Sequence, residues 1–387
     1  MSVLPRVLLF HNSLWAHYKA KVFTHLVATA QQEGSVEVIV VHLATTEKVR
    51  LSLSTPDLTA HQYPYRVLFE QPFETIASAA LYQAMWAEII RTDPAVVCLP
   101  GYNHPAYWRI LFRLAGSRRL LVLPVDSTYY DHPRIWYKES FKRLLLQMVD
   151  LVFCYGQMQR QYLTMLGVSP SRIYRRIQAT DNKRLLRVVR EHRSDRTGRQ
   201  HQRRFLYVGR LDPEKNLLHL LAAYRACNTD WELVLVGDGS QRPALEAYAE
   251  QYALSGVRFV GALSWSAVAT HYADADVFVL PSSSEPWGLV VNEAMLCQLP
   301  VLVSTHCGCS LDLVESGGNG FLFPPSDTQA LTKLLRWCID NQDRLAEMGK
   351  RSAEIIAYYE PQRAAAQMLG GFHRLLDLPP PLALTDS

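Results

Sequence analysis

Short apolar runs alternate with helix-length amphipathic segments along the 387-residue chain, and this alternation constrains the fold more than any other feature. Nearly continuous runs of Val, Leu, Ile and Phe between helices are typical of parallel sheets that helices cover on both faces. The sequence therefore predicts an α/β fold. The predicted strands are RVLLF (6–10), VEVIVVHL (36–43), AVVCLP (95–100), LLVLPV (120–125) and LVFCYG (151–156) in the first half, and RFLYVG (204–209), WELVLVG (231–237), VRFVG (257–261), DVFVLP (276–281), PVLVS (300–304) and GFLFP (320–324) in the second.

The length and the spacing of these strands predict two domains. A chain of 387 residues is too long for one ordinary core, and two domains of roughly 150–200 residues are the natural expectation. We predict Rossmann-like domains over residues 1–183 and 204–359, as two doubly wound parallel sheets facing a cleft, joined by a basic linker at 184–203. A solvated linker is the simplest interpretation of this Arg-rich stretch, and a surface for an anionic membrane or a polyanionic substrate is the alternative.

The composition excludes several classes of protein. A net charge of +4 gives no reason to expect nucleic acid as a partner. Seven cysteines, mostly in apolar runs, predict reduced thiols in a cytoplasmic protein. The pair in HCGCS (306–310) has no second Cys/His pair at ligand spacing, so no metal site is expected. The first apolar run is too short for a signal peptide, and no run reaches the ~18 apolar residues of a membrane-spanning helix.

Ligands of doubly wound sheets bind beyond the carboxyl ends of the strands, so the strand-to-helix loops are where functional residues are expected. The loop GRLDPEKN (209–216) supplies Gly209, Arg210 and Lys215. A glycine allows close approach of the backbone to a ligand, and a guanidinium with an ammonium suits a diphosphate. The alternative is a polar turn in which Asp212 and Pro213 begin a helix.

The loop GDGSQ (237–241) contributes Gly237 and Gly239 before a helix. Such a glycine pair is compatible with a nucleotide-binding loop. It is equally compatible with a tight strand-to-helix turn that has no ligand.

The stretch PSSSEPWGLVVNEAM (281–295) is the most specific one. A helix that begins at Gly288 has unpaired first-turn amides at Gly288, Leu289 and Val290, which form an anion site. Glu285 precedes this helix and Glu293 lies within it, so the two carboxylates belong to different elements. We therefore do not expect the paired acid and nucleophile of a glycosidase. The two side chains are predicted to bind separate hydroxyl-bearing parts of one ligand, with a solvated helix position as the alternative for Glu293.

Taken together, these motifs resemble the retaining glycosyltransferases of family 4, which have the GT-B fold. The resemblance rests on the E-x7-E of Glu285 and Glu293, GRLxxEKN (209–216), VGDG (236–239) and HCGCSLDLVESGGNGFLF (306–323), and it is dense from about 204 to 325. It implies that Arg210 and Lys215 bind the donor pyrophosphate, that Glu285 contacts the transferred sugar and that Glu293 contacts the ribose. It also implies that residues 204–359 bind the nucleotide sugar and that a helix at about 360–378 crosses back to the acceptor-side domain.

In the first domain the resemblance is looser. A histidine of that domain typically contacts the donor sugar in this family, and His104 in PGYNHPAYW (100–108) is the best candidate, with a structural histidine in a polar turn as the alternative. His11 and His17 are weaker candidates. The family often has a Gly-rich loop after the first strand, whereas HNSLWAHYKAK (11–21) contains no Gly. Tyr18 and Lys19 are compatible with a subset of the family in which this loop serves the acceptor.

The expected function is transfer of a hexose-like sugar from a nucleotide diphosphate sugar to a saccharide, lipid-linked or small-molecule acceptor, with retention of configuration, in polysaccharide or glycoconjugate biosynthesis. No metal or other cofactor is expected, because the two cations can stabilise the leaving diphosphate. The alternatives are a nucleotide-sugar epimerase and a non-catalytic nucleotide-sugar-binding protein on the same fold. The expected location is cytoplasmic, including the inner face of the membrane. There WYKESFKRLLLQMV (136–149) is either an amphipathic membrane-contacting helix or an ordinary packed one.

Overall fold

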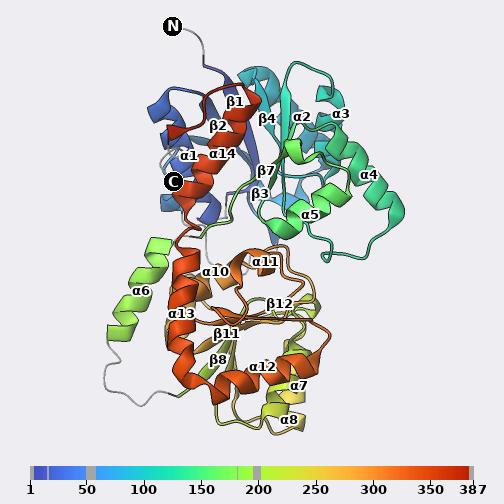
Figure 1. The fold of residues 1–387 in the computed structure, drawn as a ribbon. Helices are drawn as coiled ribbons and strands as arrows, with labels where there is room; N and C mark the ends of the chain where they lie inside the picture. The colour runs from blue at the N-terminus through green and yellow to red at the C-terminus, as the bar shows by residue number, and fades with distance from the viewer. Residues whose placement is uncertain (1–3, 15–16, 49–57, 181, 195–201, 383–387) are drawn as a thin grey trace. The chain divides into compact units, whose positions relative to one another are not determined.

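The computed structural model describes residues 4–14, 17–48, 58–180, 182–194 and 202–382 (Figure 1). These residues form two compact units. Unit 1 comprises the described residues of Met1–Asp126, Arg134–Ala179 and Pro361–Ser387, and unit 2 those of Ser127–Pro133 and Thr180–Glu360. Each unit is built on one sheet whose strands pair in parallel, which confirms the predicted fold class of two doubly wound α/β units.

In the described part of unit 1, the sheet has the strand order β3-β2-β1-β4-β5-β6-β7. The order reverses between β1 and β4, and this switch point is where sheets of this kind bind ligands. The strands are β1 (Arg6–Ser13), β2 (Glu37–Thr46), β3 (Tyr65–Pro72), β4 (Val96–Cys98), β5 (Leu120–Val125), β6 (Leu151–Cys154) and β7 (Ile173–Arg175). The helices are α1 (His17–Glu33), α2 (Ser78–Thr92), α3 (Pro105–Leu114), α4 (Trp136–Gln147), α5 (Gln157–Met165) and α14 (Pro361–Leu375).

Helix α14, the last of the chain, belongs to unit 1 and lies beside α1 (Figure 1). Its Gln367 accepts a hydrogen bond from the backbone N–H of Ile177 at 2.8 Å, which ties the helix to the segment after β7. The ring of Phe372 packs edge-on against Phe153 of β6 at 5.6 Å. A Cβ on Gly371 would lie 2.5 Å from the same Phe153 ring, so a glycine is needed for this close approach.

In the described part of unit 2, the sheet has the strand order β10-β9-β8-β11-β12-β13, and the order reverses between β8 and β11. The strands are β8 (Arg204–Val208), β9 (Glu232–Val236), β10 (Val257–Gly261), β11 (Val277–Leu280), β12 (Val301–Ser304) and β13 (Gly320–Phe323). The helices are α6 (Asn182–Ser194), α7 (Leu217–Cys227), α8 (Arg242–Gln251), α9 (Trp265–Asp274), α10 (Leu289–Leu296), α11 (Ser310–Leu313), α12 (Thr328–Asp340) and α13 (Gln342–Ile356).

Helix α6 corrects the prediction of a solvated linker at 184–203. Leu185 and Val189 are one helical turn apart and are both buried, so the apolar residues of this basic stretch form one packed face. The helix packs against α9 and α10 of unit 2, and His192 hydrogen-bonds Asp274 of α9 at 2.8 Å. Residues 195–201 of the predicted linker lie outside the described residues.

Two further findings concern membrane-spanning helices and disulfides among the described residues. None of their helices combines the length and the apolar character that crossing a membrane requires. All seven cysteines lie in the described part of the chain, and no disulfide joins any of them.

Candidate functional site

A pocket of about 170 Å³ lies in unit 2 at the carboxyl ends of β8 and β11, where the strand order reverses. This is the position that the fold favours for a ligand. Tyr207, Val208 and Leu280 contribute to its wall. Seven residues predicted from the sequence also line it, namely Gly209, Arg210, Lys215, Glu285, Gly288, Leu289 and Val290.

Lys215 and Glu285 form an ion pair at the centre of this group, with 2.5 Å between the ammonium nitrogen and a carboxylate oxygen. Their side chains are only 12% and 15% exposed, so the pair is shielded from solvent. Lys215 ends a 3₁₀ helix (Pro213–Lys215), and the next residue, Asn216, has a left-handed backbone with φ 57°. The Asn216 amide donates to the carbonyl oxygens of Pro281 and Pro325, which fixes the turn that presents Lys215.

Arg210 is the more exposed cation of the pocket. Its guanidinium bonds two carboxylates of its own loop, Asp212 and Glu214, and the contact with Glu214 is 2.7 Å long. The side chain is 60% exposed. An anion that enters the pocket must therefore compete with these carboxylates for Arg210, while Lys215 has to leave Glu285.

The loop that carries Glu285 is held from both sides. The Glu285 carbonyl accepts from the N–H of Gly308 at 2.8 Å, and the Trp287 carbonyl accepts from the N–H of Cys309 at 3.1 Å. Cys309 is fully buried, and burial raises the pKa of its thiol well above the usual value. The HCGCS stretch therefore acts as a packed support for the Glu285 loop in this structure.

Gly288 separates this loop from helix α10. Its φ of 96° lies in the region that favours glycine, and it is the residue just before the helix. Leu289 and Val290 line the pocket. Their backbone N–H groups lie in the first turn of α10 and have no partner within the helix. The partial positive charge of the helix N-terminus adds to the charge of Lys215 and Arg210.

Glu293 lies on α10 outside the residues that line the pocket. Its carboxylate accepts a hydrogen bond from the hydroxyl of Tyr272 at 2.8 Å. Burial raises the pKa of Glu293 to about 7, although the bond from Tyr272 opposes the shift. The side chain is thus neither a freely solvated carboxylate nor a wall of the ligand-free pocket, and its predicted contact with a ribose stays a prediction.

Gly237 and Gly239 have a structural explanation. A Cβ on Gly237, whose φ is 134°, would lie 1.8 Å from the Gly209 carbonyl oxygen. One on Gly239 would lie 2.7 Å from the backbone of Leu211. The loop after β9 therefore packs directly on the loop after β8. The glycines support the loop of Arg210 and are not among the residues that line the pocket.

His104 belongs to unit 1 and caps helix α3. Its Nδ1 accepts from the backbone N–H of Ala106 at 3.2 Å, and its ring lies against Phe73 and Tyr107 at 5.4 and 5.2 Å. Burial lowers the pKa of the imidazole. The cap satisfies one amide that the helix leaves unpaired, which supports the structural alternative. Its predicted contact with a donor sugar stays a prediction.

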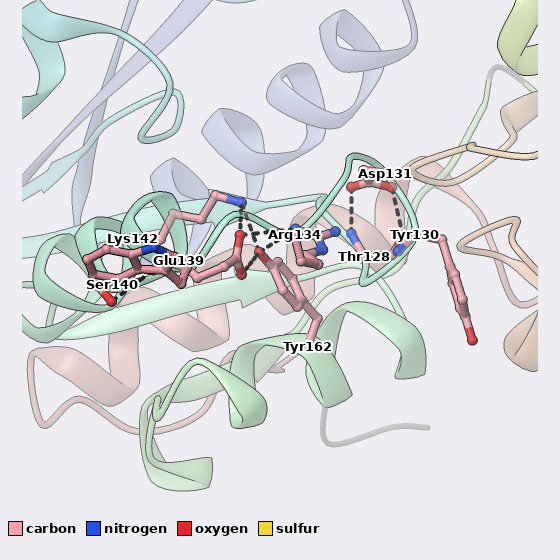
Figure 2. A network of polar contacts seen from close by, with 9 residues as sticks. Thr128, Tyr130, Asp131, Arg134, Glu139, Ser140, Lys142 and Tyr162 are labelled. Atoms are coloured by element: carbon pink, nitrogen blue, oxygen red, sulfur yellow. Dashed lines mark hydrogen bonds and ion pairs between the residues drawn. The ribbon is translucent and has the colours of Figure 1, made fainter.

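A segment that the sequence assigned to the first domain packs on unit 2 beside Glu285. Within Ser127–Pro133, the ring of Tyr130 stacks on His306 at 3.8 Å, and the carbonyl of Asp131 accepts from the Ser284 hydroxyl at 3.0 Å. Asp131 also accepts from the backbone and hydroxyl of Thr128, which closes the turn (Figure 2). Tyr130 and His306 are far apart in the sequence, so no local pattern indicates this contact.

Residues 189–355 match the family model described as glycosyl transferases group 1. The match contains every residue that lines the unit 2 pocket. This part of the chain is therefore similar to that family, as the motifs led us to expect.

Curated relatives agree over the same region. The chain is 32% identical over 166 residues to the sulfoquinovosyl transferase SQD2 of Arabidopsis thaliana, a match that covers 42% of this chain and 32% of the relative. It is 34% identical over 165 residues to a GDP-mannose-dependent alpha-mannosyltransferase of Mycolicibacterium smegmatis, covering 40% and 42%. The matched segment thus spans less than half the length of these relatives.

Solved structures show the same fold along nearly the whole chain. The Anabaena protein HepE, crystallised with UDP and glucose, is 21% identical with a TM-score of 0.72, and the match covers 97% of this chain and 100% of HepE. The apo form of the lipopolysaccharide outer core galactosyltransferase WaaB is 15% identical with a TM-score of 0.71, covering 96% and 99%. At these identities the likeness establishes the fold.

The raised pKa of Glu293 predicts a pH-dependent stability difference. The folded state holds the proton of Glu293 more tightly than the unfolded state does. The contribution of Glu293 to the free energy of unfolding is therefore fully stabilising below the ordinary carboxyl pKa of 4.5, and it is lost as the pH rises through about 7. The variant Glu293→Gln cannot ionise. We expect it to match the parent at pH 4.5 and to exceed it by about 1–3 kcal/mol at pH 8.5.

Urea unfolding of both proteins at the two pH values measures this difference. Glu347→Gln on α13 changes an exposed carboxylate and serves as the control, for which no pH-dependent difference is expected. A constant difference between Glu293→Gln and the parent across the pH range would contradict a buried, proton-binding carboxylate.

Proposed function

We propose that the chain is a retaining glycosyltransferase that moves a sugar from a nucleotide diphosphate sugar to an acceptor hydroxyl. The observation that carries this proposal is the convergence of Lys215, Glu285 and the N-terminus of α10 on one pocket within the segment that matches the family. A Lys–Glu pair beside a helix N-terminus offers a cation and amides to phosphate, and a carboxylate to sugar hydroxyls. UDP, which is bound to HepE, and GDP, which carries the mannose used by the Mycolicibacterium smegmatis mannosyltransferase, are the first candidates for the donor nucleotide.

In the proposed reaction, the bond between the anomeric carbon and the diphosphate oxygen breaks, and the diphosphate leaves with the electron pair. Lys215, Arg210 and the amides of α10 stabilise the charge that develops on it. The acceptor hydroxyl attacks from the same face and passes its proton to the leaving phosphate, which retains the configuration. No metal ion is needed in this scheme, because the fixed cations carry the compensating charge.

Binding of the donor would give Lys215 and Glu285 new partners in place of each other. The Lys215 ammonium pairs with the Glu285 carboxylate at 2.5 Å. A donor phosphate would take the ammonium, and Glu285 would then accept a hydroxyl of the sugar. Both groups lose one partner and gain another, so neither charge is left unpaired in a shielded pocket.

The finer assignments remain part of the proposal. Glu293 is assigned to the ribose and His104 to the transferred sugar, by resemblance to family 4. The acceptor is a saccharide, a lipid-linked sugar or a small molecule, and the process is polysaccharide or glycoconjugate biosynthesis. A cytoplasmic setting is supported by the seven cysteines, none of which forms a disulfide among the described residues.

Helix α4 supports a proposed contact with the inner face of a membrane. Trp136 is 79% exposed, and Tyr137 and Leu144 are exposed beside it, interleaved with the exposed basic residues Lys138 and Arg143. Exposed aromatic and basic side chains on one helix suit the interface of an anionic bilayer.

The opposite side of α4 is held by a polar network (Figure 2). Glu139 accepts from Lys142 at 2.9 Å and from the Tyr162 hydroxyl at 2.7 Å, and Arg134 donates to the same hydroxyl at 2.7 Å. Burial opposes ionisation of Glu139, but these bonds outweigh it and lower the pKa of the carboxyl. Because this network anchors α4 to α5, Trp136 and Tyr137 can be changed without removing it.

A donor panel tests the proposed activity. We expect thermal stabilisation by one of the UDP-, GDP- or ADP-sugars and transfer of its sugar to an acceptor. Lys215→Ala should lower kcat about 100-fold to 1,000-fold, the usual effect of losing one charge-stabilising group. The exposed Lys333→Ala on α12 is the matched control and should retain full activity.

Two outcomes of the panel would contradict the transferase. Release of an epimerised nucleotide sugar from donor alone would indicate the epimerase. Binding of a donor without turnover, for every acceptor class tested, would indicate the non-catalytic binding protein.

Vesicle sedimentation tests the membrane contact. The protein should bind phosphatidylglycerol vesicles more than phosphatidylcholine vesicles at low salt, and the double variant Trp136→Ala with Tyr137→Ala should lose most of this binding. Tyr252→Ala, which removes an exposed aromatic of unit 2, should bind like the parent. Equal binding of the parent and the double variant would contradict the role of α4.

A further inference from the structure

Unit 1 contains a pocket of its own at the carboxyl edge of its sheet. Its volume is about 240 Å³, far above the ~10–15 Å³ that one water molecule requires. The ends of β1, β4, β5 and β6 and the segment after β7 contribute to the wall, so the pocket includes the switch point between β1 and β4. Two cationic residues line it, Lys19 and Arg176.

Lys19 is buried and hydrogen-bonds only neutral groups among the described residues. Its ammonium lies 3.1 Å from the Tyr155 hydroxyl and 3.2 Å from the Gln178 side-chain oxygen, and 4.7 Å from the centre of the Tyr155 ring. The side chain is 7% exposed. Burial lowers the pKa of Lys19 well below its usual value, and the nearby charge of Arg176 lowers it further.

The buried guanidinium of Arg176 makes fewer hydrogen bonds than the Lys19 side chain. It is 3% exposed, and its Nε and one terminal nitrogen, Nη2, have no hydrogen-bond partner in the part of the chain that the structure describes. The other nitrogen, Nη1, makes only a long 3.5 Å contact with the hydroxyl of Tyr155. Buried guanidinium donors without partners are costly, so a ligand that accepts hydrogen bonds from Arg176 would remove this cost.

The other titratable groups of the wall leave this positive charge in place. His11 bonds the Ser13 carbonyl at 2.9 Å, and burial lowers the pKa of its imidazole well below the usual value, which keeps it neutral. Asp126 is exposed, and its charge favours the protonated form of Lys19, while Glu47 is half-buried; neither carboxylate hydrogen-bonds Arg176. The most buried part of the pocket therefore combines the Arg176 guanidinium and the Lys19 amine with several unused N–H donors.

We propose that this pocket binds a phosphate group of the acceptor, with the Arg176 fork and the Lys19 ammonium on its oxygens. A guanidinium edge suits two oxygens of a phosphate, and the negative charge of the bound phosphate would favour the protonated form of Lys19 beside it. The remaining volume accommodates an organic part of the same molecule. The assignment of the phosphate to the acceptor rests on the proposed transferase function. The binding of a phosphate in unit 1 is independent of that function.

Titration calorimetry with inorganic phosphate tests the site in a Lys215→Ala background, in which the pocket of unit 2 contributes little. We expect phosphate to bind the Lys215→Ala protein. Adding Arg176→Gln or Lys19→Met to it should weaken phosphate binding at least tenfold. Arg175→Gln, which changes the exposed neighbouring arginine of β7, is the matched control and should bind like the parent. Thermal unfolding checks each variant, and Lys19→Met decides the matter if Arg176→Gln does not fold.

Organic phosphates then identify the source of the group. A hexose 1-phosphate that binds more tightly than inorganic phosphate indicates a phosphorylated sugar, and a short-chain phosphatidic acid that does so indicates a lipid phosphate. The proposal is overturned if the Lys215→Ala protein binds no phosphate, if acetate binds as tightly as phosphate, or if all variants bind alike. Donor binding with Lys215 intact is a separate readout, so a failure of the proposed transferase is distinguishable from a failure of this site.

Discussion

Parallel pairing of the strands is the constraint on which the rest of this structure depends. Because parallel strands all end at the same edge of their sheet, each strand-to-helix loop of a unit emerges at that edge. One reversal of strand order in each sheet then separates the neighbouring loops and leaves room for a pocket. Both pockets described above lie at such a reversal, between β8 and β11 in unit 2 and around β1 and β4 in unit 1.

The two pockets differ in how their charges are satisfied without a ligand. In unit 2 the cations already have carboxylate partners, Glu285 for Lys215 and the acidic residues of its own loop for Arg210. Such a site can exchange partners when an anion arrives. In unit 1 Lys19 and Arg176 have only neutral hydrogen-bond partners among the described residues. Such a site favours anion binding more strongly, and its buried charge without an anionic partner lowers the stability of unit 1.

Much of the fold was predictable from the sequence, because buried parallel strands are continuous apolar runs. The two strands of unit 1 that the pattern missed are edge strands. β3 is half-exposed along most of its length, so YRVLFEQP lacks a continuous apolar run, and β7 has only three residues. Helix α6 was missed for a different reason. Its charged residues dominate the composition, while two apolar positions a turn apart are enough to pack it.

The candidate site was predictable where it depends on local motifs. GRLDPEKN and PSSSEPWG each present their residues within one loop, and the sheet brings the two loops together. Contacts between distant segments were not predictable. Three such contacts are the hydrogen bond of Tyr272 to Glu293, the packing of the Gly237 loop on Gly209 and the stack of Tyr130 on His306, and each joins residues at least 21 positions apart. The cluster of Lys19 with Tyr155 and Arg176 spans more than 130 positions, and no local pattern indicates it.

The central claim is that Lys215 holds the diphosphate while Glu285 holds the sugar. Calorimetric affinities of the Glu285→Gln variant for the donor nucleotide sugar and for its nucleoside diphosphate test this division most directly. The account predicts that the variant binds the nucleoside diphosphate at least as tightly as the parent, because Lys215 is released from its ion pair, and that it loses the extra affinity contributed by the sugar. An equal loss of affinity for both ligands would contradict the account.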